Sequence, residues 1–401
     1  MTFLELALRR AGFQNLREFQ EANGLYPSGE TSILTMQRLE PYFLGFQRHL
    51  IRPGDTLYGL ARAGGISVSQ LLAANPGVQP QKLAIGQYLT VPLPFPVVPT
   101  EVPFSYEVLQ IVLQGLLARY PSILSARTLT QTDFGRSVSV LRIGAGQRTV
   151  LYNAAHHANE WITTPVLMKF LESYAQAYTQ GGEVFGISAR ELFARTTLHL
   201  VPMVDPDGVD LVTGAIAPGS SEYERARRIA EAFPAIPFPD GWKANLNGVD
   251  LNLNYPAGWE QAREIKFAQG YTQPAPRDYV GAAPLDQRES TAMAELTEQI
   301  EPDLTLSYHT QGGEIYWKYQ DIEPPRAQEI GRRFAAVSGY TLEEVPYASG
   351  FAGYKDWFVL RFGRPGYTVE AGRGVNPLPL SQFGEIYRDN LGILTLGLQL
   401  A

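Results

Sequence analysis

The chain has 401 residues, of which 45% are hydrophobic, so it is long enough for more than one domain with a substantial core. It contains no cysteine, which excludes disulfides, thiolate nucleophiles and sulfur-ligated zinc. The net charge is −7 and the basic residues are scattered, which argues against a nucleic-acid partner.

Residues 1–20 carry early charges and an amphipathic pattern, whereas a signal peptide needs a basic start and an unbroken apolar stretch. No segment approaches the roughly 18 uncharged apolar residues of a membrane span. We therefore expect neither a conventional export signal nor a membrane-spanning segment.

Apolar residues at roughly helical spacing predict that residues 1–45 are helical. Phe19-Gln20 and Asn23-Gly24-Leu25 resemble parts of the small helical peptidoglycan-binding domain. A plain helical cap on the following module fits the same residues, so both interpretations stay open.

Residues 46–93 have the pattern strand, helix, helix, strand. Asp55 or Thr56 can cap the first helix, and Ser67 can cap the second, which Asn75-Pro76-Gly77 ends. The Pro-Gly-Asp-Thr-Leu, Ala-Asn-Pro and Leu-Ala-Ile-Gly-Gln sequences of this region resemble a LysM module. That resemblance implies binding to the N-acetylglucosamine chains of peptidoglycan or chitin.

A proline-rich stretch follows, with five prolines in residues 92–103. Proline disfavours both helix and central strand, so we expect an extended, semi-rigid linker over residues 94–103. The main domain boundary is predicted there.

Residues 104–401 alternate apolar strand-like runs with amphipathic helical patterns, which predicts an α/β domain with a largely parallel sheet covered on both sides. The clearest strands are residues 150–155, 197–204, 304–308 and 367–370, and the clearest helices are residues 162–178 and 285–300.

Polar residues stand where these strands end: His157, Asp205, His309 and Glu370. In open α/β sheets, ligands bind beyond the carboxyl ends of the strands, so we expect these residues to meet at one edge. Glu160, three residues after His157, would lie on the same face of a helix that starts there. An isolated His-x-x-Glu can also be a surface pair. With His309, however, two imidazoles and one carboxylate would leave an open zinc position for water, as in hydrolytic sites.

Five short motifs in this order make residues 104–401 resemble the zinc carboxypeptidase family: His157-Ala158-Asn159-Glu160-Trp161, Asp205-Pro206-Asp207-Gly208, Gly248-Val249-Asp250-Leu251-Asn252, Ser307-Tyr308-His309 and Thr368-Val369-Glu370. The resemblance implies a mixed sheet flanked by helices and one Zn²⁺ per chain. The zinc ligands would be His157, Glu160 and His309, with Glu370 as the general base and acid.

Three other histidines are outside this expected ligand set: His49, His156 and His199. We expect His156 to support the site or the fold, and the other two to have structural roles.

Zinc lowers the pKa of its bound water towards about 7, and a carboxylate can take the proton and later give it to the departing amine. The oxyanion that forms needs a second positive partner. By resemblance, Lys243 takes the place of an arginine in the pancreatic enzymes, and Tyr347 that of a mobile tyrosine over the substrate. An ordinary exposed lysine and a packed tyrosine are the alternatives.

One departure from the family concerns the Asn-Arg pair that binds the terminal carboxylate of the substrate, because this chain has Asn252-Leu253. Leucine cannot form a charge-assisted bond to a carboxylate, which puts strict exopeptidase activity in doubt. With the wall-binding modules, the chain resembles bacterial γ-D-glutamyl-meso-diaminopimelate endopeptidases, which cut peptidoglycan stem peptides. Lys355 and Arg373 are candidates to bind substrate carboxylates, although either can be a solvated surface charge.

Two alternatives remain: a broad carboxypeptidase, if Arg373 replaces the missing arginine, and a non-catalytic glycan-binding protein. The intact His157, Glu160, His309 and Glu370 argue against the second. The sequence leaves open the choice between diaminopimelate and lysine, the stem length and the oligomeric state. A cell-wall substrate implies that the protein acts outside the cell, or inside it in the spore or in the pathway that recycles the wall.

Overall fold

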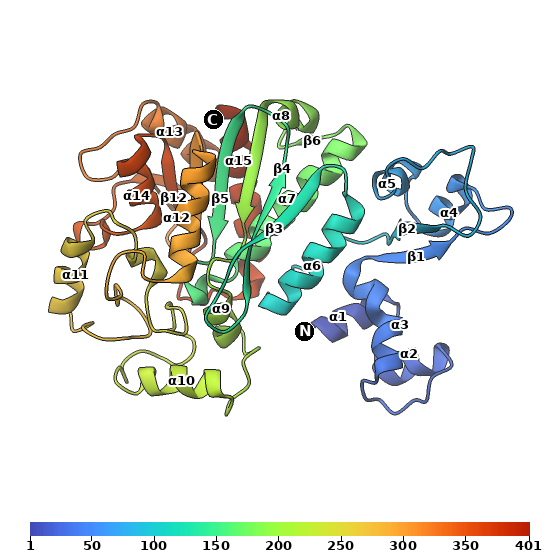
Figure 1. The fold of residues 1–401 in the computed structure, drawn as a ribbon, viewed down its shortest axis with the longest axis horizontal. Helices are drawn as coiled ribbons and strands as arrows, with labels where there is room; N and C mark the ends of the chain where they lie inside the picture. The colour runs from blue at the N-terminus through green and yellow to red at the C-terminus, as the bar shows by residue number, and fades with distance from the viewer.

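The computed structural model describes residues 1–401. Its larger part is built on an eight-stranded sheet with helices on both faces, and a smaller N-terminal part lies to one side (Figure 1). No helix combines the length and the apolar character needed to cross a membrane.

The first 45 residues form three helices, in agreement with the helical pattern of the sequence. Each begins at a side-chain cap, supplied by Thr2, Asn15 and Ser32 respectively. Helix α3 packs against α1 and also against α6 of the larger part. The helices are α1 (Phe3–Arg10), α2 (Leu16–Ala22) and α3 (Ile33–Leu44).

The next unit has the predicted order of strand, helix, helix and strand, with the two strands antiparallel. Thr56, and not Asp55, caps the first helix, and Ser67 forms a capping box on the second. Asp55 instead accepts the backbone N–H of Arg52 (2.7 Å) and contacts His49 Nε2 (2.7 Å). The elements are β1 (Phe46–Leu50), α4 (Leu57–Ala63), α5 (Val68–Ala73) and β2 (Tyr88–Pro92).

The N-terminal units are joined to the larger part by buried contacts. Arg119, at the end of α6, donates hydrogen bonds to the carbonyls of Gly45 (3.1 Å from Nε) and Leu93 (2.8 Å). The proline-rich residues have no regular structure, but Val97 and Val98 are buried in the main core. The linker is therefore packed along the larger part, and the domain limits drawn from the sequence stay a prediction.

The large sheet has the strand order β11-β10-β12-β9-β5-β8-β4-β3. Four of its seven strand pairs are parallel, and the pairs β3–β4, β4–β8 and β10–β12 are antiparallel. The strands are β3 (Leu124–Gln131), β4 (Ser137–Ile143), β5 (Arg148–Ala154), β8 (Thr196–Val201), β9 (Leu304–His309), β10 (Glu314–Tyr316), β11 (Thr341–Glu343) and β12 (Gly366–Glu370).

Helices cover both faces of this sheet (Figure 1). Side chains alternate along β5, so that Val150 and Tyr152 enter one core and Leu151 enters the other. The first core contains residues of α6 (Tyr106–Arg119), α7 (Thr163–Gln180), α13 (Ala327–Ser338) and α15 (Phe383–Leu400), and the second contains residues of α12 (Arg288–Ile300) and α14 (Tyr354–Phe362).

Shorter elements occupy the connections between these layers. They are η1 (Ala158–Glu160), β6 (Glu183–Val184), β7 (Ile187–Ser188), α8 (Ala189–Arg195), α9 (Pro206–Val212), α10 (Ser221–Ala230), η2 (Leu251–Leu253), α11 (Trp259–Ala268), η3 (Tyr347–Ser349) and η4 (Leu380–Gln382).

The mixed sheet that the family resemblance implies is confirmed, because antiparallel strands stand on both sides of the parallel centre. The structure corrects two details of the expected elements. The strand expected over residues 197–204 ends at Val201, because Pro202 has no N–H to donate to a hydrogen bond between strands. Helix α12 starts at Arg288, because Leu285 has a φ of 57°, outside the helical region.

Glu289, in the first turn of α12, gives a pH-dependent prediction of stability. Burial raises its pKa to about 7, from an ordinary value of 4.5. Between these two pH values the unfolded chain has lost the proton that the folded chain keeps, so stability falls as pH rises. The unfolding free energy of Glu289→Gln minus that of wild type should therefore be larger at pH 8 than at pH 4, by up to about 3 kcal/mol. Urea denaturation at both pH values measures this increase, and an equal difference at both would contradict it.

Candidate metal centre and active site

The carboxyl ends of three neighbouring strands bring the predicted site residues together. His309 ends β9 and Glu370 ends β12, and the two are paired in the parallel register of these strands. After β5 the chain turns at Ala155, whose φ is 51°, and then starts η1, so that His157 and Glu160 enter from the adjacent strand. The convergence inferred from the strand ends is thus observed for three of the four residues. Asp205 is the exception: it follows β8 by four residues and caps α9, where it accepts the backbone N–H of Gly208 (2.9 Å).

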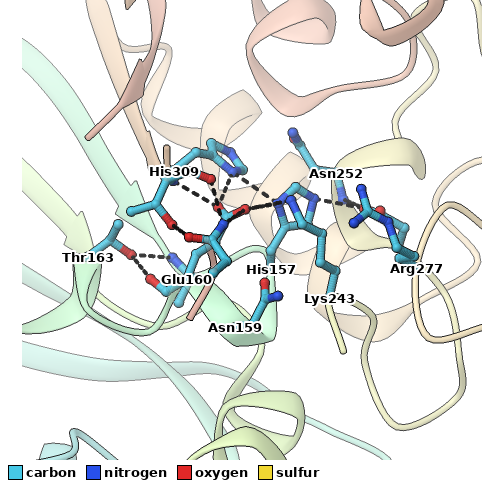
Figure 2. A network of polar contacts seen from close by, with 12 residues as sticks. His157, Asn159, Glu160, Thr163, Lys243, Asn252, Arg277 and His309 are labelled. Atoms are coloured by element: carbon cyan, nitrogen blue, oxygen red, sulfur yellow. Dashed lines mark hydrogen bonds and ion pairs between the residues drawn. The ribbon is translucent and has the colours of Figure 1, made fainter. Parts of the chain in front are cut away.

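Three side chains form the only group of His, Asp or Glu residues able to hold a metal ion in the structure, and they are the predicted ones: His157, Glu160 and His309. Figure 2 shows these three side chains turned towards one another. His309 Nδ1 lies 3.2 Å from His157 Nδ1 and 2.9 Å from Glu160 Oε2. His157 Nδ1 lies 3.0 Å from Glu160 Oε1.

These separations fit a tetrahedral cation site. Ligand atoms about 2.0–2.1 Å from zinc at tetrahedral angles are about 3.3 Å apart, which is close to the observed contacts. The two Nδ1 atoms and the carboxylate are also the nitrogen and oxygen donors that zinc takes where no cysteine is present. The residues present therefore fit one Zn²⁺ per chain.

Asp250 fixes the orientation of His157, because its Oδ1 lies 3.0 Å from Nε2 of that imidazole. A ring that donates from Nε2 keeps its Nδ1 lone pair for a metal. Burial opposes a charge on His157, but Glu160 and Asp250 outweigh it and raise the pKa of His157 to about 9. A metal at this site therefore competes with a proton.

Removing the Asp250 carboxylate should weaken the metal site without removing a ligand. For Asp250→Ala we expect a zinc dissociation constant about 10- to 100-fold higher than that of the wild type. Competition with a chromogenic chelator measures the constant, and Asp321→Ala, at an exposed aspartate, is the matched control. An unchanged constant would show that Asp250 does not support the ligand.

Glu160 is surrounded by donors. Lys243 Nζ lies 2.8 Å from its Oε1, and the backbone N–H of Thr310 donates to Oε2 (3.2 Å). Asn376 Nδ2 is 3.4 Å from Oε1. Although burial favours the neutral acid, Lys243 and His157 hold the pKa of Glu160 well below its usual range. Glu160 is thus an anionic ligand, with Lys243 directly beside it.

Glu370 is a half-buried carboxyl of the site, and no hydrogen bond or ion pair joins it to a cationic side chain. Burial, with the charge of Glu160 adding to it, raises the pKa of Glu370 to about 8. A divalent cation at the three ligands would lower this value again. A carboxyl in this pKa range can both accept and return a proton near neutral pH.

A cleft of about 1300 Å³ opens over this centre. Lys243 and Glu370 line it, as do two of the predicted substrate-binding residues, Asn252 and Lys355. Lys355 is 3% exposed; its ammonium donates to the Lys318 carbonyl (2.7 Å) and contacts Asp356, so it is not a solvated surface charge.

The other two predicted substrate-binding residues do not line this cleft. Tyr347 is 65% exposed and packs edge-on against Phe351, with 5.1 Å between ring centroids. The guanidinium of Arg373 lies beside Gly313. Their contacts with substrate stay predictions.

The remaining histidines do not belong to the group of potential metal ligands. His156 is buried, contacts Tyr255 Oη (3.0 Å) and stacks on His309, so it packs behind the ligand. His199, in β8, pairs with Arg142 of β4, and burial lowers the pKa of His199 to about 4.

Asp250, Arg277 and Asn376 are among the cleft residues that were given no role from the sequence. Asp250 was visible within a family motif, and the general need of a zinc-bound histidine for a carboxylate partner would have indicated it. Arg277 and Asn376 lie in irregular loops, where no periodicity predicts a position.

Comparison with known proteins agrees with this geometry. The zinc carboxypeptidase family model matches residues 109–391, and the LysM domain model matches residues 49–92. The chain is 41% identical, over 403 aligned residues, to gamma-D-glutamyl-L-diamino acid endopeptidase 1 of Lysinibacillus sphaericus, covering 88% of this chain and 99% of that protein.

Two solved structures share the fold. Bovine thrombin-activatable fibrinolysis inhibitor superposes with a TM-score of 0.56 at 15% identity, over 75% of this chain and 98% of that one. Carboxypeptidase A of Helicoverpa armigera gives 0.53 at 19% identity, over 85% and 79% respectively. Because the family model matches residues 109–391 and the relative is 41% identical over 88% of the chain, the chain belongs to the zinc carboxypeptidase family, and it carries a LysM domain.

Proposed function

We propose that the protein is a zinc peptidase that hydrolyses the amide between γ-D-glutamate and the diamino acid of peptidoglycan stem peptides. The observation that carries the hydrolytic part is the grouping of His157, Glu160 and His309 beside an open cleft, which Glu370 also lines. The choice of substrate is supported by the 41% identical relative, which is matched over nearly its whole length and is named for this activity.

Zinc held by the three ligands would supply a Lewis acid and a lowered pKa for water. Glu370, on the neighbouring strand, takes a proton from the attacking water and returns it to the leaving nitrogen. Lys243 is largely buried, and the charge of Glu160 outweighs that burial and raises the pKa of Lys243. It therefore stays cationic and can stabilise the negative charge that develops on the carbonyl oxygen.

Leu253 supports an endopeptidase rather than a strict carboxypeptidase. It follows Asn252 in η2 and presents no charge to the cleft that both residues line. The LysM domain would tether the enzyme to wall glycan, which keeps stem peptides at a high local concentration.

Digestion of synthetic stem peptides tests this function. We expect the zinc-loaded protein to cut L-alanyl-γ-D-glutamyl-diaminopimelate only at the γ-amide, with both products identified by mass spectrometry. The α-linked isomer should resist cleavage and serves as the matched control.

Two results would overturn the proposal. Removal of only the last residue from ordinary peptides would indicate a general carboxypeptidase. Binding to peptidoglycan with no cleavage of any peptide would indicate a glycan-binding protein.

A further inference from the structure

Arg277 lines the cleft over the metal ligands and has unused hydrogen-bond donors. Its Nε donates to Asp278 Oδ2 (2.6 Å), whereas neither terminal amino group has a hydrogen-bond partner. The side chain is 40% exposed, and Figure 2 shows its guanidinium turned towards Asn252 and His157. The two terminal amino groups of Arg277 are thus free hydrogen-bond donors at the cleft.

The carboxylate of Asp250 holds this segment beside the metal centre. Its Oδ1, which contacts His157, also accepts the backbone N–H of Asn252 (3.2 Å). Its Oδ2 accepts the backbone N–H of Asp278 (3.2 Å). One buried carboxylate therefore fixes a metal ligand, Asn252 and the Arg277–Asp278 loop relative to one another.

The amide of Asn252 is oriented in the same way. Its Oδ1 accepts the backbone N–H of Tyr354 (3.0 Å), which leaves Nδ2 as a donor without a partner. Asn252 and Arg277 therefore bring unpaired N–H donors to one wall of the cleft.

Local charge also favours an anion at this wall. Lys266 Nζ lies 2.5 Å from Asp278 Oδ1, so Arg277 and Lys266 share a single carboxylate. The positive charge of Arg277 is consequently not fully neutralised by its neighbours. A planar guanidinium with two free amino groups matches the two oxygens of a carboxylate.

We propose that Arg277 and Asn252 form a subsite for a free carboxylate of the peptide substrate, close to the amide that is cut. This inference rests on the proposed peptidase function and refines it. Arg277 supplies the cation of this subsite from the irregular segment between α11 and α12. The carboxylate is either the α-carboxylate of the γ-linked glutamate or the α-carboxylate of the diamino acid beside the cleaved amide nitrogen, and the experiment separates these two sources.

The test compares three peptides with wild type and Arg277→Gln: the unmodified γ-D-glutamyl-diamino acid tripeptide, and two forms each amidated at one of these carboxylates. For wild type, amidation of the bound carboxylate should raise KM at least about tenfold, with a smaller effect on kcat. Arg277→Gln should raise KM for the unmodified peptide by a similar factor. In this variant, amidation of the same carboxylate should cause no further increase in KM.

The control variants separate charge, geometry and folding. Arg277→Lys should restore only part of the affinity, because lysine lacks the planar fork. Arg332→Gln, at an exposed arginine of α13 outside the cleft, should behave as wild type. Zinc content and melting temperature check that Arg277→Gln is folded.

Calorimetric binding of the same peptides to zinc-loaded Glu370→Gln, with and without Arg277→Gln, gives a readout that needs no turnover. If wild type cleaves no stem peptide but binding still depends on the carboxylate and on Arg277, the subsite stands and the proposed reaction fails. Equal KM and affinity for all three peptides, or an unchanged preference in Arg277→Gln, would overturn the subsite.

Discussion

Glu370→Gln should lower kcat for stem-peptide cleavage by roughly 10²- to 10⁴-fold and leave the zinc content at one per chain. Glutamine has almost the same shape as glutamate but cannot accept a proton from water. The variant should therefore keep the fold and the metal while losing the proton transfer. Steady-state kinetics with metal analysis of the same samples measures both quantities.

Glu343→Gln, at an exposed glutamate of the nearby strand β11, is the matched control and should keep full activity. The wild-type rate should rise with pH as Glu370 loses its proton, and the residual activity of Glu370→Gln should lack that rise. A variant within a few-fold of wild type would show that another group moves the proton.

His309→Ala should reduce bound zinc far below one per chain and lower cleavage to background. Only His157 and Glu160 would remain, and two protein ligands are too few for a stable zinc site. Dialysis against a chelator, followed by metal analysis and a cleavage assay, measures the loss.

His199→Ala is the control for that variant, since this histidine lies on β8 outside the metal group. A melting temperature near that of zinc-free wild type would show that His309→Ala is folded. Full zinc occupancy in folded His309→Ala would exclude His309 as a ligand.

Much of the sheet could be predicted from the sequence, because its central strands are continuous apolar runs. The runs at residues 150–155, 197–204, 304–308 and 367–370 correspond to β5, β8, β9 and β12, which are adjacent in the sheet. Three outer strands were missed for two reasons. Strands β10 and β11 have three residues each, and β3 is largely exposed, so none of these three has an apolar run.

The three candidate metal ligands could be predicted because they lie at or just after the ends of recognisable strands, and the spacing between His157 and Glu160 is local. Roles that depend on loop packing were not. Arg277 enters the cleft from the irregular segment between α11 and α12, whereas Arg373, closer in sequence to Glu370, lies outside the cleft lining. The pairing of Lys355 with Asp356 also arises only in the folded chain.

Anomalous diffraction at the zinc absorption edge, from crystals grown with one equivalent of zinc, locates the cation itself. We expect one peak per chain, about 2.0–2.2 Å from Nδ1 of His157, Nδ1 of His309 and the carboxylate of Glu160. A peak bound by other side chains, or none at these three in protein that cleaves stem peptides, would contradict the proposed metal centre.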